Sequence, residues 1–137
     1  MKKVILVRGL PGSGKTTFAK RMREDIQSKG ESCVWLETSM YTDDTGEPII
    51  SPKQTPIVTG WLLQKVDSAL NEVDNVIISR VSLDKNDINQ FRDVADMHEA
   101  EFVVYRLDTH WEDKIPTGAL ELMKKDMIPY QREIVIS

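Results

Sequence analysis

The segment from Gly9 to Thr16 constrains the fold more than any other part of the chain. It reads GLPGSGKT and matches the pattern G-x-x-x-x-G-K-[ST] at every fixed position. A short apolar run at residues 4–7 precedes it, and apolar residues recur at every fourth position from Phe18 to Ile26. This pattern predicts a buried strand, a glycine loop and a helix in direct succession. That context favours a phosphate-binding loop over a simple glycine turn before a helix.

The residue types of the loop suit a polyphosphate. Glycines let the backbone turn tightly and bring its N–H groups close to phosphate oxygens, and the following helix N-terminus favours an anion. Lys15 is placed to reach the β- and γ-phosphates, and the Thr16 hydroxyl is placed to bind Mg²⁺. We therefore expect ATP or GTP with Mg²⁺ as cofactors, with Lys15 also acting in catalysis and Thr16 as the metal ligand. The residues expected to bind the nucleotide are Gly9, Gly12, Ser13, Gly14, Lys15, Thr16, Thr17 and, from a later strand, Arg80.

Composition narrows the class of protein further. The chain has 137 residues with 40% apolar and 29% charged side chains, which predicts one globular domain over residues 1–137. The net charge of −4 does not favour free polynucleotide as a partner on bulk charge alone. The single cysteine, Cys33, predicts a buried, reduced thiol. The first apolar run is too short for a signal peptide or a membrane span, so we expect a cytoplasmic protein that does not contact membranes.

Predicted strands and helices alternate along the chain. Strands are expected near residues 4–7, 32–36, 76–78 and 102–105, and helices near 14–28, 59–71, 84–97 and 116–127. Residues 134–136 read as a fifth strand or as an apolar tail that docks on a partner. The alternation indicates an α/β fold with a mostly parallel sheet flanked by helices. In such sheets ligands bind at the carboxyl ends of the strands.

Several later segments carry a family resemblance together with the loop. They are MKKVIL and PGSGK in the opening, IVTG at residues 57–60, VIIS at residues 76–79, and Ile115-Pro116 before a helix that carries Leu120 and Met123. In this order the chain resembles the kinase module of phage polynucleotide kinase and related small P-loop kinases that phosphorylate 5′-hydroxyls of nucleic acid. The resemblance implies transfer of phosphate from ATP to a hydroxyl of a nucleotide or a nucleic acid 5′ end. A phage origin would place the protein in the host cytoplasm.

The chain departs from that family at three parts of the site. The family has two aspartates and a tyrosine after strand two, the first aspartate being the general base, where this chain has Ser39-Met40-Tyr41. After strand three the family has aspartate, threonine and asparagine, where this chain has Arg80-Val81-Ser82. The family's basic lid corresponds here to residues 108–114, which contain Lys114 as their only lysine or arginine.

These losses require substitutes if the chain is an enzyme. A positioned general base contributes about 10² to 10⁴ in rate, and an arginine on the transferred phosphoryl group contributes about 10³ to 10⁵. Asp43, Asp44 and Glu37 are the candidate replacement bases, although Asp43 and Asp44 also suit a solvated turn. Arg80 is the candidate arginine, unless it forms a structural ion pair or a partner subunit supplies one.

Two main functions therefore stay open at this point. The first is a small phage-type kinase that transfers phosphate to a nucleotide, a nucleic acid end or a related small molecule. The second is a catalytically degenerate nucleotide-binding protein that acts as a regulator or interaction module. A simple NTPase, with water as the acceptor, is a third reading, and an oligomer is compatible with each of them.

Overall fold

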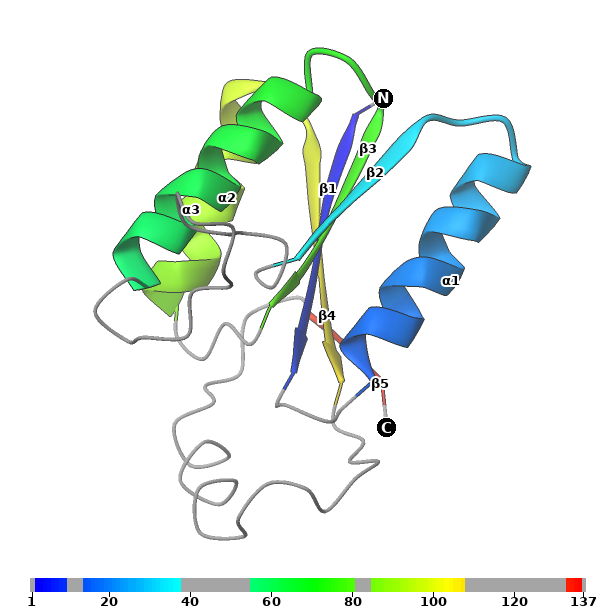
Figure 1. Ribbon diagram of the computed structural model, residues 1–137, viewed down its shortest axis with the longest axis horizontal. Helices are drawn as coiled ribbons and strands as arrows, with labels where there is room; N and C mark the ends of the chain where they lie inside the picture. Colours follow the sequence, from blue (N-terminus) through cyan, green and yellow to red (C-terminus); the bar gives the residue numbers. More distant parts are fainter. Residues whose placement is uncertain (1, 10–13, 38–54, 81–84, 108–132, 137) are drawn as a thin grey trace, which may run out of the picture.

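The computed structural model describes residues 2–9, 14–37, 55–80, 85–107 and 133–136 (Figure 1). Within these ranges five strands form one sheet: β1 (Lys3–Gly9), β2 (Cys33–Glu37), β3 (Asn75–Arg80), β4 (Glu101–Leu107) and β5 (Ile134–Ile136). The strand order is β2-β3-β1-β4-β5, and every neighbouring pair is parallel. The predicted α/β fold with a parallel sheet is thus confirmed. All five strands have their carboxyl ends at the same edge of the sheet.

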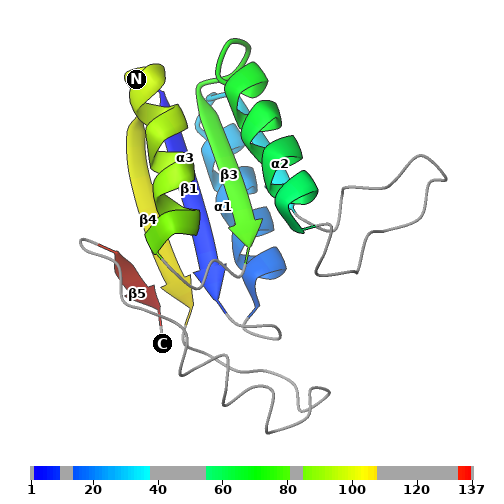
Figure 2. The same ribbon diagram turned by 90° about the vertical axis from the view of Figure 1, so that its left-hand side faces the viewer.

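Helices cover both faces of the sheet. Helix α1 (Lys15–Ser28) lies on one face, and α2 (Thr55–Ala69) and α3 (Lys85–Met97) lie on the other (Figures 1 and 2). Helix α2 begins four residues before the predicted start at residue 59. Pro56 explains the difference, because proline is favoured in the first turn of a helix. The spacing of apolar residues predicts a helix only from the first apolar residue of its buried face.

The alternation of side chains along β1 divides the core into two parts. Val4 and Leu6 pack with α2 and α3, whereas Ile5 and Val7 pack under α1. The apolar stripe predicted for the second helix is buried as expected; its members are Leu62, Val66 and Leu70. Since both faces of β1 are covered, its apolar run is continuous, as is typical of a central parallel strand.

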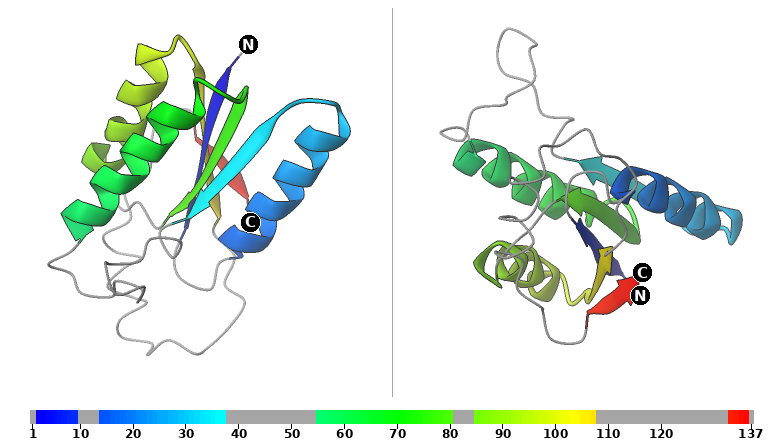
Figure 3. Two further views of the ribbon diagram at one scale, coloured as in Figure 1. Left: turned by 45° about the horizontal axis from the view of Figure 1, so that its top comes forward. Right: turned by 90° about the horizontal axis from the view of Figure 1, so that it is seen from below.

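The structure decides between the two readings of residues 134–136. This segment is β5, which pairs in parallel with the last three residues of β4, from Tyr105↔Ile134 to Leu107↔Ile136. Figure 3 shows β5, in red, beside β4 at one edge of the sheet. Ile134 and Val135 remain exposed there. The segment is therefore part of the sheet and not a free tail.

Some expectations fall outside the described residues. They are the expectations for residues 38–54 and for residues 108–132, and the second of these ranges includes the predicted helix over 116–127. Cys33 is buried, as predicted. None of the helices in the described part of the chain has the length and apolar character needed to cross a membrane.

Candidate functional site

The described ends of the glycine loop carry the backbone features expected of a phosphate site. Gly9 is the last residue of β1, and Gly14 is the N-cap of α1 with φ 90° and ψ 20°. This left-handed conformation strains other residues and explains the glycine. No side chain caps α1 and its first turn holds no acidic residue, so the helix itself does not neutralise the positive end of its dipole. The exposed Thr17 lies in the same first turn.

Lys15 links the two described ends of the loop. Its Nζ donates a 2.9 Å hydrogen bond to the carbonyl oxygen of Gly9, which brings the ammonium group back over the start of the loop. Burial lowers the pKa of Lys15 from 10.5 to about 8, and the negative charge of Glu37 partly opposes this shift. The Lys15 ammonium group is thus partly desolvated beside the loop. A phosphate bound there would stabilise its positive charge.

Thr16 and Glu37, expected from the sequence to bind metal and to act in catalysis, are in direct contact. The Thr16 hydroxyl donates a 2.6 Å hydrogen bond to Oε1 of Glu37, which is the last residue of β2. Glu37 lies opposite Ser79 of β3 in the register of the sheet. The first turn of α1 and the carboxyl end of β2 therefore meet at this pair.

The oxygen atoms of this pair fit a magnesium ion. Mg²⁺ prefers oxygen ligands and usually combines one or two protein oxygens with substrate phosphates and water. In the part of the chain that the structure describes, no group of three or more His, Cys, Asp or Glu side chains could hold a metal. Among the described residues, Thr16 and Glu37 could hold a magnesium ion together with the phosphates of a nucleotide.

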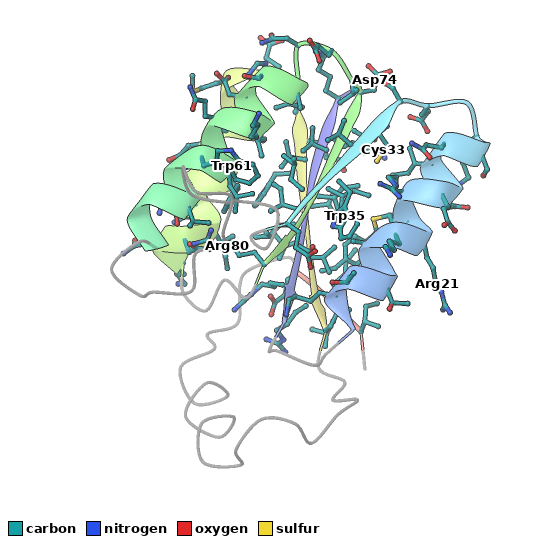
Figure 4. All side chains as sticks on the ribbon, viewed as in Figure 1. Arg21, Cys33, Trp35, Trp61, Asp74 and Arg80 are labelled. Carbon is teal, nitrogen blue, oxygen red and sulfur yellow. The ribbon has the colours of Figure 1, made fainter. Side chains whose placement is uncertain are left out.

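Trp35 supports the end of β2 below this pair. Its indole N–H donates a 2.9 Å hydrogen bond to the Ser79 hydroxyl, which fastens β2 to β3 near their carboxyl ends. Lys20 and Arg23 of α1 lie over the ring, at 5.8 and 5.5 Å from its centroid. Figure 4 shows Trp35 between the sheet and α1. The packing of α1 against β2 thus fixes the two elements that carry Thr16 and Glu37.

Arg80 lies at the carboxyl end of β3 on the opposite face of the sheet, toward α2 and α3. Its Nε and Nη2 contact the two carboxylate oxygens of Asp87 at 3.1 and 3.0 Å. Nη2 also donates a 2.6 Å hydrogen bond to the hydroxyl of Thr59 in α2. The structural ion pair considered from the sequence is therefore present. Binding of the nucleotide by Arg80 stays a prediction.

Two further arginines lie in register with Arg80, and sequence reasoning did not identify them. Arg8 of β1 is opposite Arg80 on one side and Arg106 of β4 on the other. Glu133 accepts hydrogen bonds from Arg8 at 2.8 Å and from Arg106 at 2.5 Å. The signal in the sequence is a charged residue directly before the first glycine of the loop, inside a strand that is otherwise apolar.

The structure thus unites Gly9, Gly14, Lys15, Thr16 and Glu37 at one corner of the sheet edge and leaves Arg80 on its other face. Thr17 lies beside them in the first turn of α1. The other predicted site residues lie outside the described residues; they are Gly12, Ser13, Asp43 and Asp44.

Comparison with known proteins agrees with this arrangement. The model of the AAA domain family matches residues 4–114. The structure is similar to that of the Mycobacterium tuberculosis APS kinase CysC in complex with AMPPNP and APS, with a TM-score of 0.67, 20% identity and coverage of 98% of this chain and 88% of that chain. A gluconokinase from Sinorhizobium meliloti 1021 gives a TM-score of 0.62 at 15% identity, covering 98% and 81% of the two chains. A chain of the Pnkp1/Rnl/Hen1 complex gives 0.60 at 21% identity, covering 88% of this chain and 38% of that chain. At these identities the likeness establishes a P-loop kinase-like fold.

Proposed function

The chain belongs to the AAA domain family, and from that premise we propose that it is a kinase that transfers phosphate from ATP·Mg²⁺ to a hydroxyl group. The observation that carries the proposal is the 2.6 Å hydrogen bond between the Thr16 hydroxyl and the Glu37 carboxylate. A carboxylate beside the metal-binding hydroxyl can help to hold the metal or can activate the acceptor, and phosphoryl transfer needs both tasks.

Each residue of the site has a role in this proposal. Lys15 neutralises charge that develops on the β- and γ-phosphates during transfer. Thr16 would bind Mg²⁺ through its hydroxyl, and Glu37 would position that hydroxyl and contribute an oxygen atom to the metal. The magnesium ion would neutralise negative charge on the phosphates. The general base comes from Glu37, Asp43 or Asp44.

The acceptor belongs to the same proposal. The sequence resemblance supports a nucleotide or a nucleic acid 5′ end. The similarity of fold to a protein named APS kinase and to a gluconokinase supports a small molecule with a free hydroxyl. Both kinds of acceptor receive the phosphate on a hydroxyl group, so the reaction type is the same. The acceptor can therefore be identified by assaying a panel of hydroxyl compounds.

The test is transfer of labelled γ-phosphate from ATP to such a panel: a 5′-hydroxyl oligonucleotide, a nucleoside, a nucleotide and a sugar acid. We expect transfer to at least one acceptor and its loss in Lys15→Ala. Lys29→Ala is the matched control, because Lys29 is an exposed lysine at the end of α1 that lies away from the loop. Intact nucleotide binding without transfer to any acceptor would refute the proposal and favour a regulatory nucleotide-binding protein.

A further inference from the structure

We propose that Arg80 binds an anionic group of the acceptor, so that the hydroxyl compound phosphorylated by this protein carries a phosphate, a sulfate or a carboxylate. This inference rests on the kinase function proposed above and adds the chemical class of the substrate. Its basis is one nitrogen of the Arg80 guanidinium group.

The guanidinium of Arg80 is fixed on three sides. Asp87, in the first turn of α3, takes Nε and Nη2, and Thr59 of α2 takes Nη2 as well. Phe91 of α3, itself fully buried, lies with its ring centroid 5.9 Å from the central carbon of the guanidinium. These contacts hold the guanidinium against α2 and α3 and leave one of its nitrogens, Nη1, unused. Figure 4 shows Arg80 beside these two helices.

That corner has no partner. Nη1 is the one buried side-chain nitrogen or oxygen of the described residues that lacks a hydrogen bond, and the Arg80 side chain is only 10% exposed. An unsatisfied buried N–H group costs folding free energy, and a charged one costs more. A rigidly held group of this kind is pre-organised for a ligand, because little side-chain entropy remains to be lost on binding.

The position of Nη1 indicates the acceptor side of the site. Arg80 ends β3, at the sheet edge where ligands of parallel α/β folds bind. Its contacts lie with α2 and α3, whereas Lys15, Thr16 and Glu37 meet on the α1 side. A ligand group at Nη1 is therefore separated by the sheet edge from the nucleotide's phosphates.

The neighbourhood also favours an anion. Arg8 on the neighbouring strand β1, and Arg106 on β4 beyond it, occupy the same register level as Arg80, so three arginines follow one another across the sheet. Glu133 and Asp87 neutralise two of these three positive charges, so the five side chains together keep one positive charge at this part of the edge. Arginine, unlike lysine, presents a planar fork that matches the oxygens of phosphate, sulfate and carboxylate.

A purely structural role for Arg80, as a clamp that joins α2 to α3, does not explain why Nη1 has no hydrogen-bond partner. The clamp uses Nε and Nη2 for Asp87 and Thr59. A lysine at position 80 would keep the positive charge beside Asp87 but would lose the fork. Arg80→Lys therefore separates recognition of an anion from charge balance in the core.

The experiment compares acceptor pairs that differ in an anionic group: adenosine 3′-phosphate against adenosine, and gluconate against glucose. We expect kcat/KM for the anionic member to exceed that for the neutral member by about 10- to 100-fold, the range of one charge-assisted hydrogen bond. Arg80→Lys and Arg80→Gln should reduce that ratio to about threefold or less. Arg21→Gln, on the exposed outer side of α1 (Figure 4), should leave the ratio unchanged. Thermal melting establishes which variants fold. If Arg80→Gln does not fold, the comparison is made with Arg80→Lys alone.

A second measurement separates this inference from the proposed function. Inorganic phosphate is titrated by calorimetry into protein whose nucleotide site is filled with a non-hydrolysable ATP analogue. Binding to wild type that is lost in Arg80→Lys supports the anion site even if no acceptor is phosphorylated. The inference is overturned if phosphate does not bind wild type, if neutral and anionic acceptors react equally, or if Arg80→Lys keeps the wild-type ratio.

Discussion

Arg8 and Glu133 form an ion pair at 2.8 Å whose two side chains are almost completely buried, with 0% and 5% of their surface exposed. Arg8 directly precedes Gly9, the first glycine of the nucleotide loop, and Glu133 directly precedes β5. Glu133 also accepts a hydrogen bond from Arg106 of β4. The last described strand is therefore tied through one carboxylate to the strand that leads into the loop.

Replacement of this carboxylate should be costly. Glu133→Gln removes the negative charge from the buried pair with Arg8, and breaking a buried pair on one side costs about 3–5 kcal/mol in the free energy of unfolding. Urea denaturation measures the difference. The control is Lys29→Ala, which removes the exposed pair between Lys29 and Asp25 and should cost less than about 1 kcal/mol. Equal and small losses for the two variants would show that the buried pair contributes little.

Nucleotide affinity should fall at alkaline pH. The Lys15 pKa of about 8 lies below its ordinary value of 10.5, and a bound polyphosphate raises it because it stabilises the charged ammonium. Between the free and bound pKa values, binding must take up a proton, so affinity weakens as pH rises above about 8, by up to about tenfold per pH unit. Calorimetry at pH 8.5 in two buffers of different ionisation enthalpy measures the proton uptake. Identical heats in both buffers would contradict this expectation.

The contact between Thr16 and Glu37 predicts a change in magnesium dependence. Glu37→Gln keeps a side-chain oxygen for the Thr16 hydroxyl but removes the negative charge, and loss of such a supporting group weakens metal affinity by about 10- to 100-fold. The Mg²⁺ concentration that gives half-maximal phosphate transfer should rise accordingly. A lower kcat at unchanged magnesium dependence would instead assign Glu37 as the general base.

Cys33 should be unreactive in the folded protein. Burial raises the pKa of its thiol to about 11, so the thiolate that reacts with alkylating reagents is scarce at neutral pH. We expect iodoacetamide to modify folded protein at pH 8 at least about 100-fold more slowly than protein unfolded in urea. Mass spectrometry of timed samples gives both rates. Comparable rates would mean that β2 opens readily and exposes the thiol.

Much of the fold follows from local sequence signals. The apolar run of β1, the glycines at both ends of the loop and the spaced apolar residues of α1 each specify their own structure within a few residues. For the same reason the motif alone predicts Lys15 and Thr16 as site residues. Glu37 is a candidate because it lies at the end of a predicted strand, where parallel sheets bind their ligands.

The arginine row could not be predicted in this way. Arg8, Arg80 and Arg106 become neighbours only through the order and register of three strands that are distant in sequence. Glu133 reaches Arg8 only because β5 adds to the edge of β4, a pairing that the three residues of β5 do not specify by themselves. Long-range register depends on packing of the whole sheet, which no local pattern encodes.

The most direct test of the kinase account is a two-step measurement on wild-type protein in one vessel. Calorimetry first measures binding of ATP and of GTP with and without Mg²⁺, and ADP release is then followed with and without a hydroxyl acceptor from the panel above. A kinase should show magnesium-dependent nucleotide binding followed by ADP release that requires the acceptor. Binding without acceptor-dependent release would refute the proposed kinase function.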